Sequence, residues 1–171
     1  MLARLRALGV LARVSWRGVQ HDPAVATPTR VADRRQKRAL DDEVEDVSRI
    51  APEVPFRIPS RKPNTGAAIA AIASVGRVHP GRGAQLRDAL STAYWEHDED
   101  IGDPATIVRL AEEVGIPGFV DLASYEGRSD ARAWEREWTL ARLGGVPRLV
   151  RDDGKIIWNL VPVAELRGWM G

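Results

Sequence analysis

Helical periodicity through the middle of the chain is the feature that most limits how this sequence can fold. From Asp33 onward, apolar residues recur every three or four positions, which is the spacing of one face of an α-helix. The same spacing returns in later stretches that are bounded by proline, glycine or a capping side chain. We predict helices over residues 34–51, 66–75, 86–95, 104–114 and 131–143.

The first residues of the chain also have helical spacing. Leu2, Leu5 and Leu8 lie on one face of a helix that is already under way at the first residue, and Gly9 can end it in a left-handed conformation. Residues 10–18 then alternate partly between apolar and polar side chains. This alternation predicts a strand.

The C-terminal part of the chain changes from helical to strand spacing. The segment VPRLVRDDGKIIWNLV contains two short apolar runs joined by Asp153 and Gly154, a dipeptide typical of tight hairpin turns. A helix over residues 162–170 is predicted to follow. A strand, a helical block, a hairpin and a helix form an α/β order, in which we expect the strands of both ends to share one sheet.

The composition is that of an ordinary folded domain. Of the 171 residues, 44% are hydrophobic and 29% are charged, and the net charge is +1, so we expect no nucleic-acid partner. The basic residues Arg34, Arg35 and Lys37 precede Asp41 and Asp42, and we interpret this stretch as a solvated helix face. No apolar run approaches the roughly 20 residues that span a bilayer. We therefore expect no membrane partner and a cytoplasmic location.

The sequence contains no cysteine, which excludes disulfides, thiolate nucleophiles and thiolate metal ligands within these residues. His97 and the three acidic residues after it are the densest set of potential metal ligands. Consecutive side chains point in different directions, so we expect no metal site there. His21 and His79 lie in turns near prolines and have no recognisable nucleophile as a partner. No catalytic residue is predicted.

Three segments carry a resemblance to a known family: KPNTGAAIAA, LSTAYWEHDEDIGDPATIVRLAEEVGI and GGVPRLVRDDGKIIWNL. In their order and spacing they resemble the DsbA-like thioredoxin proteins of the FrnE and 2-hydroxychromene-2-carboxylate isomerase type, and the resemblance covers nearly the whole chain. In that family an aromatic pair precedes an acidic turn and an aspartate that starts the next helix. Tyr94, Trp95, Asp100, Ile101 and Asp103 fit this pattern.

The resemblance implies an α/β thioredoxin-like fold with a large inserted α-helical domain. It assigns residues 1–32 and 131–171 to a discontinuous thioredoxin-like core and residues 33–130 to the helical insertion. Family members begin with a strand, followed by Cys-x-x-Cys or a serine at the amino end of the first helix. This sequence starts within that helix, so we expect an N-terminally truncated fold. We also expect an open strand edge that can pair with another chain, for example in a homodimer.

The resemblance places the site residues in two turns. In thioredoxin-fold proteins the proline of a valine-proline pair before a strand is cis and lines the active site, and Val146 and Pro147 match that pair. A cis X-Pro bond turns a backbone amide and carbonyl outward, where they can pair with an extended peptide or glutathione. Arg148 follows, at the floor of this groove, where the family usually has threonine. Asn64 matches an asparagine near the glutathione or substrate groove, although helix capping explains it about as well.

Three functions remain open from the sequence. The first is that of a DsbA-family disulfide oxidoreductase relative, redox-inactive as given because it lacks cysteine. The second is that of a glutathione-dependent isomerase or transferase relative, in which an upstream serine stabilises the glutathione thiolate and no redox cysteine is required; glutathione is then a possible cofactor, and we expect no other. The third is that of a non-catalytic protein whose groove binds a peptide or another partner.

Overall fold

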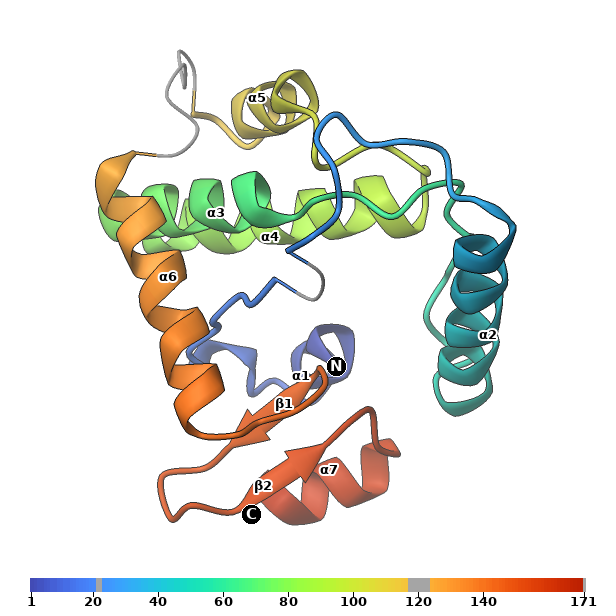
Figure 1. Ribbon diagram of the computed structural model, residues 1–171. Coiled ribbons are helices and arrows are strands. Elements are labelled where there is room, and N and C mark those ends of the chain that lie inside the picture. The colour runs from blue at the N-terminus through green and yellow to red at the C-terminus, as the bar shows by residue number, and fades with distance from the viewer. Residues whose placement is uncertain (21–22, 117–123, 171) are drawn as a thin grey trace.

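The computed structural model describes residues 1–20, 23–116 and 124–170. Within these ranges the chain is mostly helical and contains one small β-sheet (Figure 1). In chain order the elements are α1 (Leu2–Ala7), the 3₁₀ helix η1 (Leu11–Arg13), α2 (Arg34–Ile50), α3 (Gly66–Val78), α4 (Pro80–Trp95), α5 (Pro104–Glu113), α6 (Tyr125–Leu140), β1 (Arg148–Val150), β2 (Ile156–Trp158) and α7 (Val163–Met170). None of the described helices is long and apolar enough to cross a membrane.

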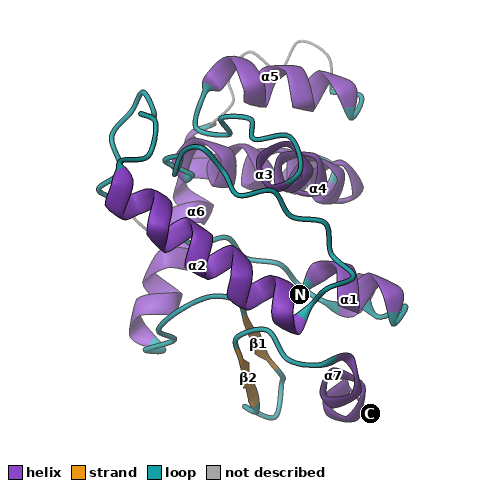
Figure 2. Cartoon of the chain, turned by 90° about the vertical axis from the view of Figure 1, so that its right-hand side faces the viewer, coloured by secondary structure: helices purple, strands orange, loops and turns teal. Residues whose placement is uncertain are grey.

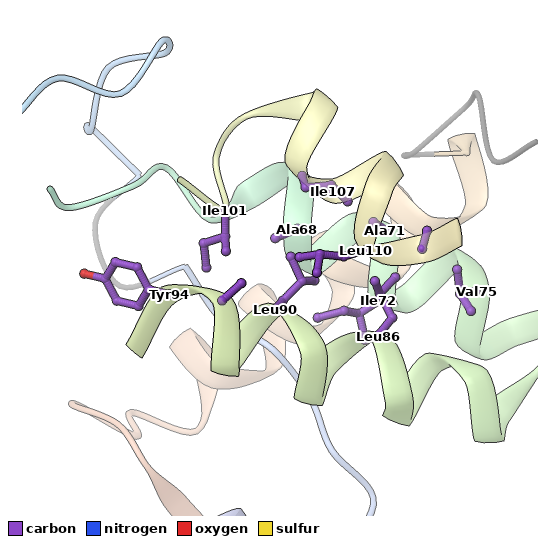
Figure 3. Packing of buried hydrophobic residues seen from close by; sticks show 12 residues of the cluster. Ala68, Ala71, Ile72, Val75, Leu86, Leu90, Tyr94, Ile101, Ile107 and Leu110 are labelled. Atoms are coloured by element: carbon purple, nitrogen blue, oxygen red, sulfur yellow. The ribbon is translucent and has the colours of Figure 1, made fainter. Parts of the chain in front are cut away.

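The larger hydrophobic core lies between α3, α4 and α5. Leu86 and Leu90 of α4 belong to one buried cluster with Ile72 of α3 and with Ile107 and Leu110 of α5 (Figure 3). The alanines of α3 have small side chains, so α4 and α6 can both pack closely against this helix. This core joins three of the five helices that the sequence predicts for the middle of the chain.

A second, smaller core joins the two ends of the chain. Leu5 of α1, Leu149 of β1, Ile157 of β2 and Leu166 of α7 form a separate buried cluster. Helices α1 and α7 lie on the same side of the hairpin (Figure 2). Residues from both ends therefore pack into one unit. The boundaries predicted from the sequence, 1–32 and 131–171 for the thioredoxin-like core and 33–130 for the helical insertion, stay a prediction.

The strands β1 and β2 form the predicted antiparallel hairpin. The register pairs Arg148 with Trp158, Leu149 with Ile157 and Val150 with Ile156. Gly154 in the turn has a φ of +80°, which glycine adopts readily. Because successive side chains of a strand alternate between faces, Leu149 and Ile157 face the smaller core and their neighbours face the opposite side.

Two helices begin directly after the aspartates from which the sequence predicts them to start. At the start of α2, the Asp33 side chain accepts a hydrogen bond from the Gln36 amide (2.8 Å), and the Gln36 side chain accepts one from the Asp33 amide (3.0 Å). This is the reciprocal arrangement of a capping box. At the start of α5, the Asp103 side chain accepts from the amides of Ala105 and Thr106, at 3.3 Å each.

Other details differ from the sequence-based expectations. The strand predicted over 10–18 is wrong, since this stretch contains η1 and then no helix or strand. A strand requires a hydrogen-bonded neighbour, and within the described ranges the only sheet is the β1–β2 hairpin.

The bounds of three helices also differ from the prediction. Helix α3 continues past Gly76, and α4 begins earlier than predicted, at Pro80, because proline is tolerated in a first turn. Helix α6 also begins earlier, because the Ser124 side chain accepts from the Gly127 amide (3.0 Å).

Arg4 links the smaller core to the C-terminal end of α2. The Arg4 side chain is only 5% exposed, and its Nε lies 2.7 Å from Glu53 Oε1. Its other nitrogens donate to the backbone carbonyls of Ile50 and Val161. A buried guanidinium is tolerated only when its donors are satisfied, and here three acceptors from different segments satisfy them.

Candidate functional site

The loop between α6 and β1 carries the valine-proline pair. The Val146–Pro147 peptide bond is cis, as the resemblance implied. Gly145, directly before the pair, has a φ of +78°, a left-handed conformation that favours glycine. Val146 is 45% exposed, and Pro147 is half-buried. The loop thus presents a valine to solvent directly before the first strand.

The Arg148 side chain is hydrogen-bonded to the backbone of this loop. Its Nη1 donates to Asn159 Oδ1 (2.9 Å) and to the Pro147 carbonyl (3.2 Å), and its Nη2 donates to the Gly144 carbonyl. Its guanidinium carbon lies 4.1 Å from the centre of the Trp158 ring, a cation–π contact. Both Nη atoms of the guanidinium are therefore engaged by the loop and by the residue after the hairpin's second strand. No local sequence signal indicates Trp158 and Asn159 as its partners, because Trp158 is the last residue of the next strand and Asn159 directly follows it.

The edge of β1 that faces away from β2 is open. On the β2 side, the Asn159 amide donates to the Pro147 carbonyl (3.1 Å) and the Arg151 amide donates to the Lys155 carbonyl (2.9 Å). Hydrogen-bonded residues alternate along an antiparallel pair, so the amides and carbonyls of Arg148 and Val150 point to the other edge. The sheet has only two strands in the described part of the chain, and Val150 is 56% exposed. Backbone donors and acceptors therefore follow directly after the cis-proline loop.

Asn64 lies in a different polar cluster, at the start of α3. Its Oδ1 accepts from the Gly66 amide (3.1 Å) and from Gln20 Nε2 (2.6 Å), and its Nδ2 donates to the Val25 carbonyl (2.7 Å). The side chain thus supports the helix start and holds the segment around residues 20–25 against it. No hydrogen bond or ion pair between described residues joins Asn64 to the loop at Val146. Gln20 was not predicted, because its partner is distant in sequence.

The strongly shifted titratable groups serve structural roles. Burial raises the pKa of Tyr94, whose hydroxyl donates to the Arg61 carbonyl (3.1 Å). Hydrogen bonds from Arg151 lower the pKa of Asp153 in the hairpin turn. His97 and its acidic neighbours form no cluster of potential metal ligands among the residues described. What the cis-proline loop and β1 offer a partner is backbone hydrogen bonding and apolar contact.

Comparison with known proteins identifies the fold. No known protein family matches the sequence, and no curated protein matches it. One similar solved structure is a "putative protein disulfide isomerase" from Nitrosomonas europaea, with a TM-score of 0.71 and 21% identity, over 82% of this chain and 74% of that chain. Another is a "probable DsbA oxidoreductase" from Streptomyces coelicolor, with a TM-score of 0.66 and 21% identity, over 90% of this chain and 72% of that chain. The α/β thioredoxin-like fold predicted from the sequence is confirmed.

Proposed function

We propose that this chain is a relative of the DsbA-like disulfide oxidoreductases that binds an extended peptide and performs no thiol–disulfide exchange with its own residues. The observation that carries the proposal is the cis Val146–Pro147 loop, which continues directly into the open edge of β1 in a sequence without cysteine. The likeness to a protein disulfide isomerase and to a DsbA oxidoreductase supports the family assignment.

The absence of thiol–disulfide exchange by these residues follows from their chemistry. Thiol–disulfide exchange requires a thiolate that attacks a disulfide sulfur and forms a mixed disulfide. The 171 residues contain no thiol, because methionine is their only sulfur-containing residue type. These residues therefore cannot form a mixed disulfide with a bound substrate.

The open edge of β1 supports an extended peptide as the ligand. A peptide that adds a strand to a sheet gains main-chain hydrogen bonds, and its alternate side chains supply specificity. Val150 offers an outward amide and carbonyl, and Val146 and Val150 both offer exposed apolar surface. We therefore propose peptides in which apolar residues alternate with polar ones.

The glutathione-dependent alternative is weaker. In the sequence it assumed an upstream serine that stabilises the glutathione thiolate, with Asn64 near the glutathione or substrate groove and glutathione as a possible cofactor. The amide of Asn64 is already engaged with Gly66, Gln20 and Val25. A glutathione molecule would have to displace these internal hydrogen bonds, which favours the peptide reading.

The peptide reading is tested with a fluorescein-labelled peptide of alternating valine and threonine and its N-methylated counterpart, which cannot form a strand ladder. We expect the first peptide to raise fluorescence anisotropy saturably and the second to bind at least tenfold more weakly. Val150→Pro removes the outward amide at a position where an edge strand tolerates proline, and we expect at least a tenfold loss of affinity. Val150→Thr keeps the amide and loses only apolar surface, so we expect it to lose much less affinity than Val150→Pro does.

Three results would contradict this proposal. Equal binding by the Val150→Pro and Val150→Thr variants would show that the edge is not used. Glutathione binding in calorimetry without peptide binding would favour the glutathione-dependent reading. A concentration-dependent dimer in sedimentation, lost in Val150→Pro and insensitive to peptide, would make a second copy the occupant of the edge.

A further inference from the structure

A hollow of about 390 Å³ lies between α3, α4, α6 and residues 14–16. Its apolar lining includes Ile72, Ala73, Pro80 and Ala84. None of its lining residues belongs to the cis-proline loop or to β1, so it is separate from the proposed peptide site. Ligand cavities in proteins commonly measure about 300–1,000 Å³.

Two indole rings form one wall of this hollow. Trp16 and Trp134 both line it, with ring centres 5.8 Å apart and planes at 78°, an edge-to-face contact. Aromatic rings bury a large apolar area and prefer edge-to-face or offset arrangements with other rings. The wall therefore suits a planar aromatic guest.

Glycines form the floor, where α3 and α4 cross. A Cβ placed on Gly83 would lie 2.7 Å from the Cα of Gly76, so the two helix backbones are almost in contact here. A Cβ placed on Gly76 would meet nothing within 4 Å. Gly76 lines the hollow, so a side chain at that position has room to fill it.

A buried arginine supplies the polar group. Arg87 is 9% exposed, and its Nε and Nη2 both donate to Asp88 Oδ1 (3.0 and 2.8 Å). Asp88 Oδ2 is bound by Arg6, so two guanidinium groups share one carboxylate. Within the described residues, Nη1 of Arg87 has no hydrogen-bond partner.

The charges around the hollow do not balance. Arg77 lies on its rim and pairs with Asp130, with Nη1 at 2.9 and 3.2 Å from the two carboxylate oxygens. Among the charged residues that line the hollow, two arginines, Arg77 and Arg87, stand against one aspartate, Asp130, and Asp88 beside Arg87 is shared with the exposed Arg6. A partly desolvated guanidinium forms strong charge-assisted hydrogen bonds with an anion.

We propose that this hollow, the Trp16–Trp134 pocket, binds a small planar aromatic monoanion. The ring of the ligand packs against the two indoles over the glycine floor, and its anionic group accepts hydrogen bonds from Arg87. The pocket shares no residue with the peptide site, so ligand binding here can be tested independently of the proposed function.

The probe is 2-naphthalenesulfonate, a planar aromatic with a fixed negative charge, titrated into the 171-residue protein by calorimetry. Its neutral counterpart is naphthalene-2-sulfonamide. We expect one molecule of the sulfonate per chain and at least tenfold weaker binding of the sulfonamide. Arg87→Met should bring both ligands to the same weak affinity, whereas Arg128→Met, an exposed change on α6, should leave the preference intact.

A second variant fills the pocket without removing a contact. Gly76→Leu places a side chain into the hollow within a helix, so the protein should remain folded, and we expect at least a tenfold loss of sulfonate binding. Gly168→Leu adds the same side chain to a helical glycine of α7 with open surroundings and should bind as the parent does. Undiminished binding by Gly76→Leu, equal binding of the two naphthalene ligands, or no sulfonate binding by the parent would each overturn the proposal.

Discussion

Two arginines of α1 have the same chemistry and very different surroundings. Arg4 is 5% exposed and is satisfied by Glu53 and by the carbonyls of Ile50 and Val161. Arg6 is 56% exposed and pairs with Asp88 at the surface. We predict that Arg4→Met lowers the free energy of unfolding by about 1.5–3 kcal/mol, because it removes the charged hydrogen bonds that tie α1 to residues 50–53 and to Val161.

Urea denaturation followed by tryptophan fluorescence measures this difference. Arg6→Met is the matched control from the same helix, and we expect it to change the free energy of unfolding by no more than about 1 kcal/mol, as for exposed ion pairs. Equal losses for the two variants would mean that Arg4 does not anchor α1 to the end of α2.

At the scale of the elements, the hairpin turn depends on one glycine. Gly154 has a φ of +80°, and a Cβ there would meet no atom within 4 Å, so an added methyl group strains only the backbone. We predict that Gly154→Ala destabilises the protein by about 1–2 kcal/mol. The same change at Gly168, within α7, should stabilise it by up to about 1 kcal/mol. Thermal unfolding followed by circular dichroism measures both, and shifts of the same sign would contradict this account.

Elements with local signals were predicted from the sequence, and those with distant partners were not. Asp33 and Asp103 cap the helices that follow them, so the starts of α2 and α5 are readable from a few neighbouring residues. The stretch 10–18 has strand-like alternation, but strand formation needs a paired neighbour, and the alternation does not supply one. The cis Val146–Pro147 loop followed from the resemblance. The contacts of Arg148 with this loop and with Trp158 did not, because they depend on a partner across the hairpin.

At the scale of the whole molecule, stability is divided unevenly between two cores. The cluster of α3, α4 and α5 contains twelve buried residues, and the cluster of α1, the hairpin and α7 contains four. Local opening is easiest where few apolar contacts are buried. We therefore predict that the amides of α7 and the hairpin exchange with solvent deuterium through smaller opening free energies than those of α3 and α4.

Hydrogen exchange read by mass spectrometry on peptides from each region tests this order. Leu166→Ala, in the smaller core, should accelerate exchange in α7 and the hairpin while leaving α3 protected. Leu86→Ala, in the larger core, should accelerate exchange throughout. Uniform protection in the parent protein would show that the two cores open together.

Asp88 lies where these two cores meet, since it accepts from Arg6 of α1 and from Arg87 of α4. Its carboxylate forms ion pairs with both arginines, and so links the smaller core, built from the chain ends, to the larger helical core. Dissolved ions weaken exposed charge pairs, over a Debye length of about 8 Å at physiological ionic strength. The strength of the ion pairs that join the two cores therefore depends partly on the ionic strength of the solution.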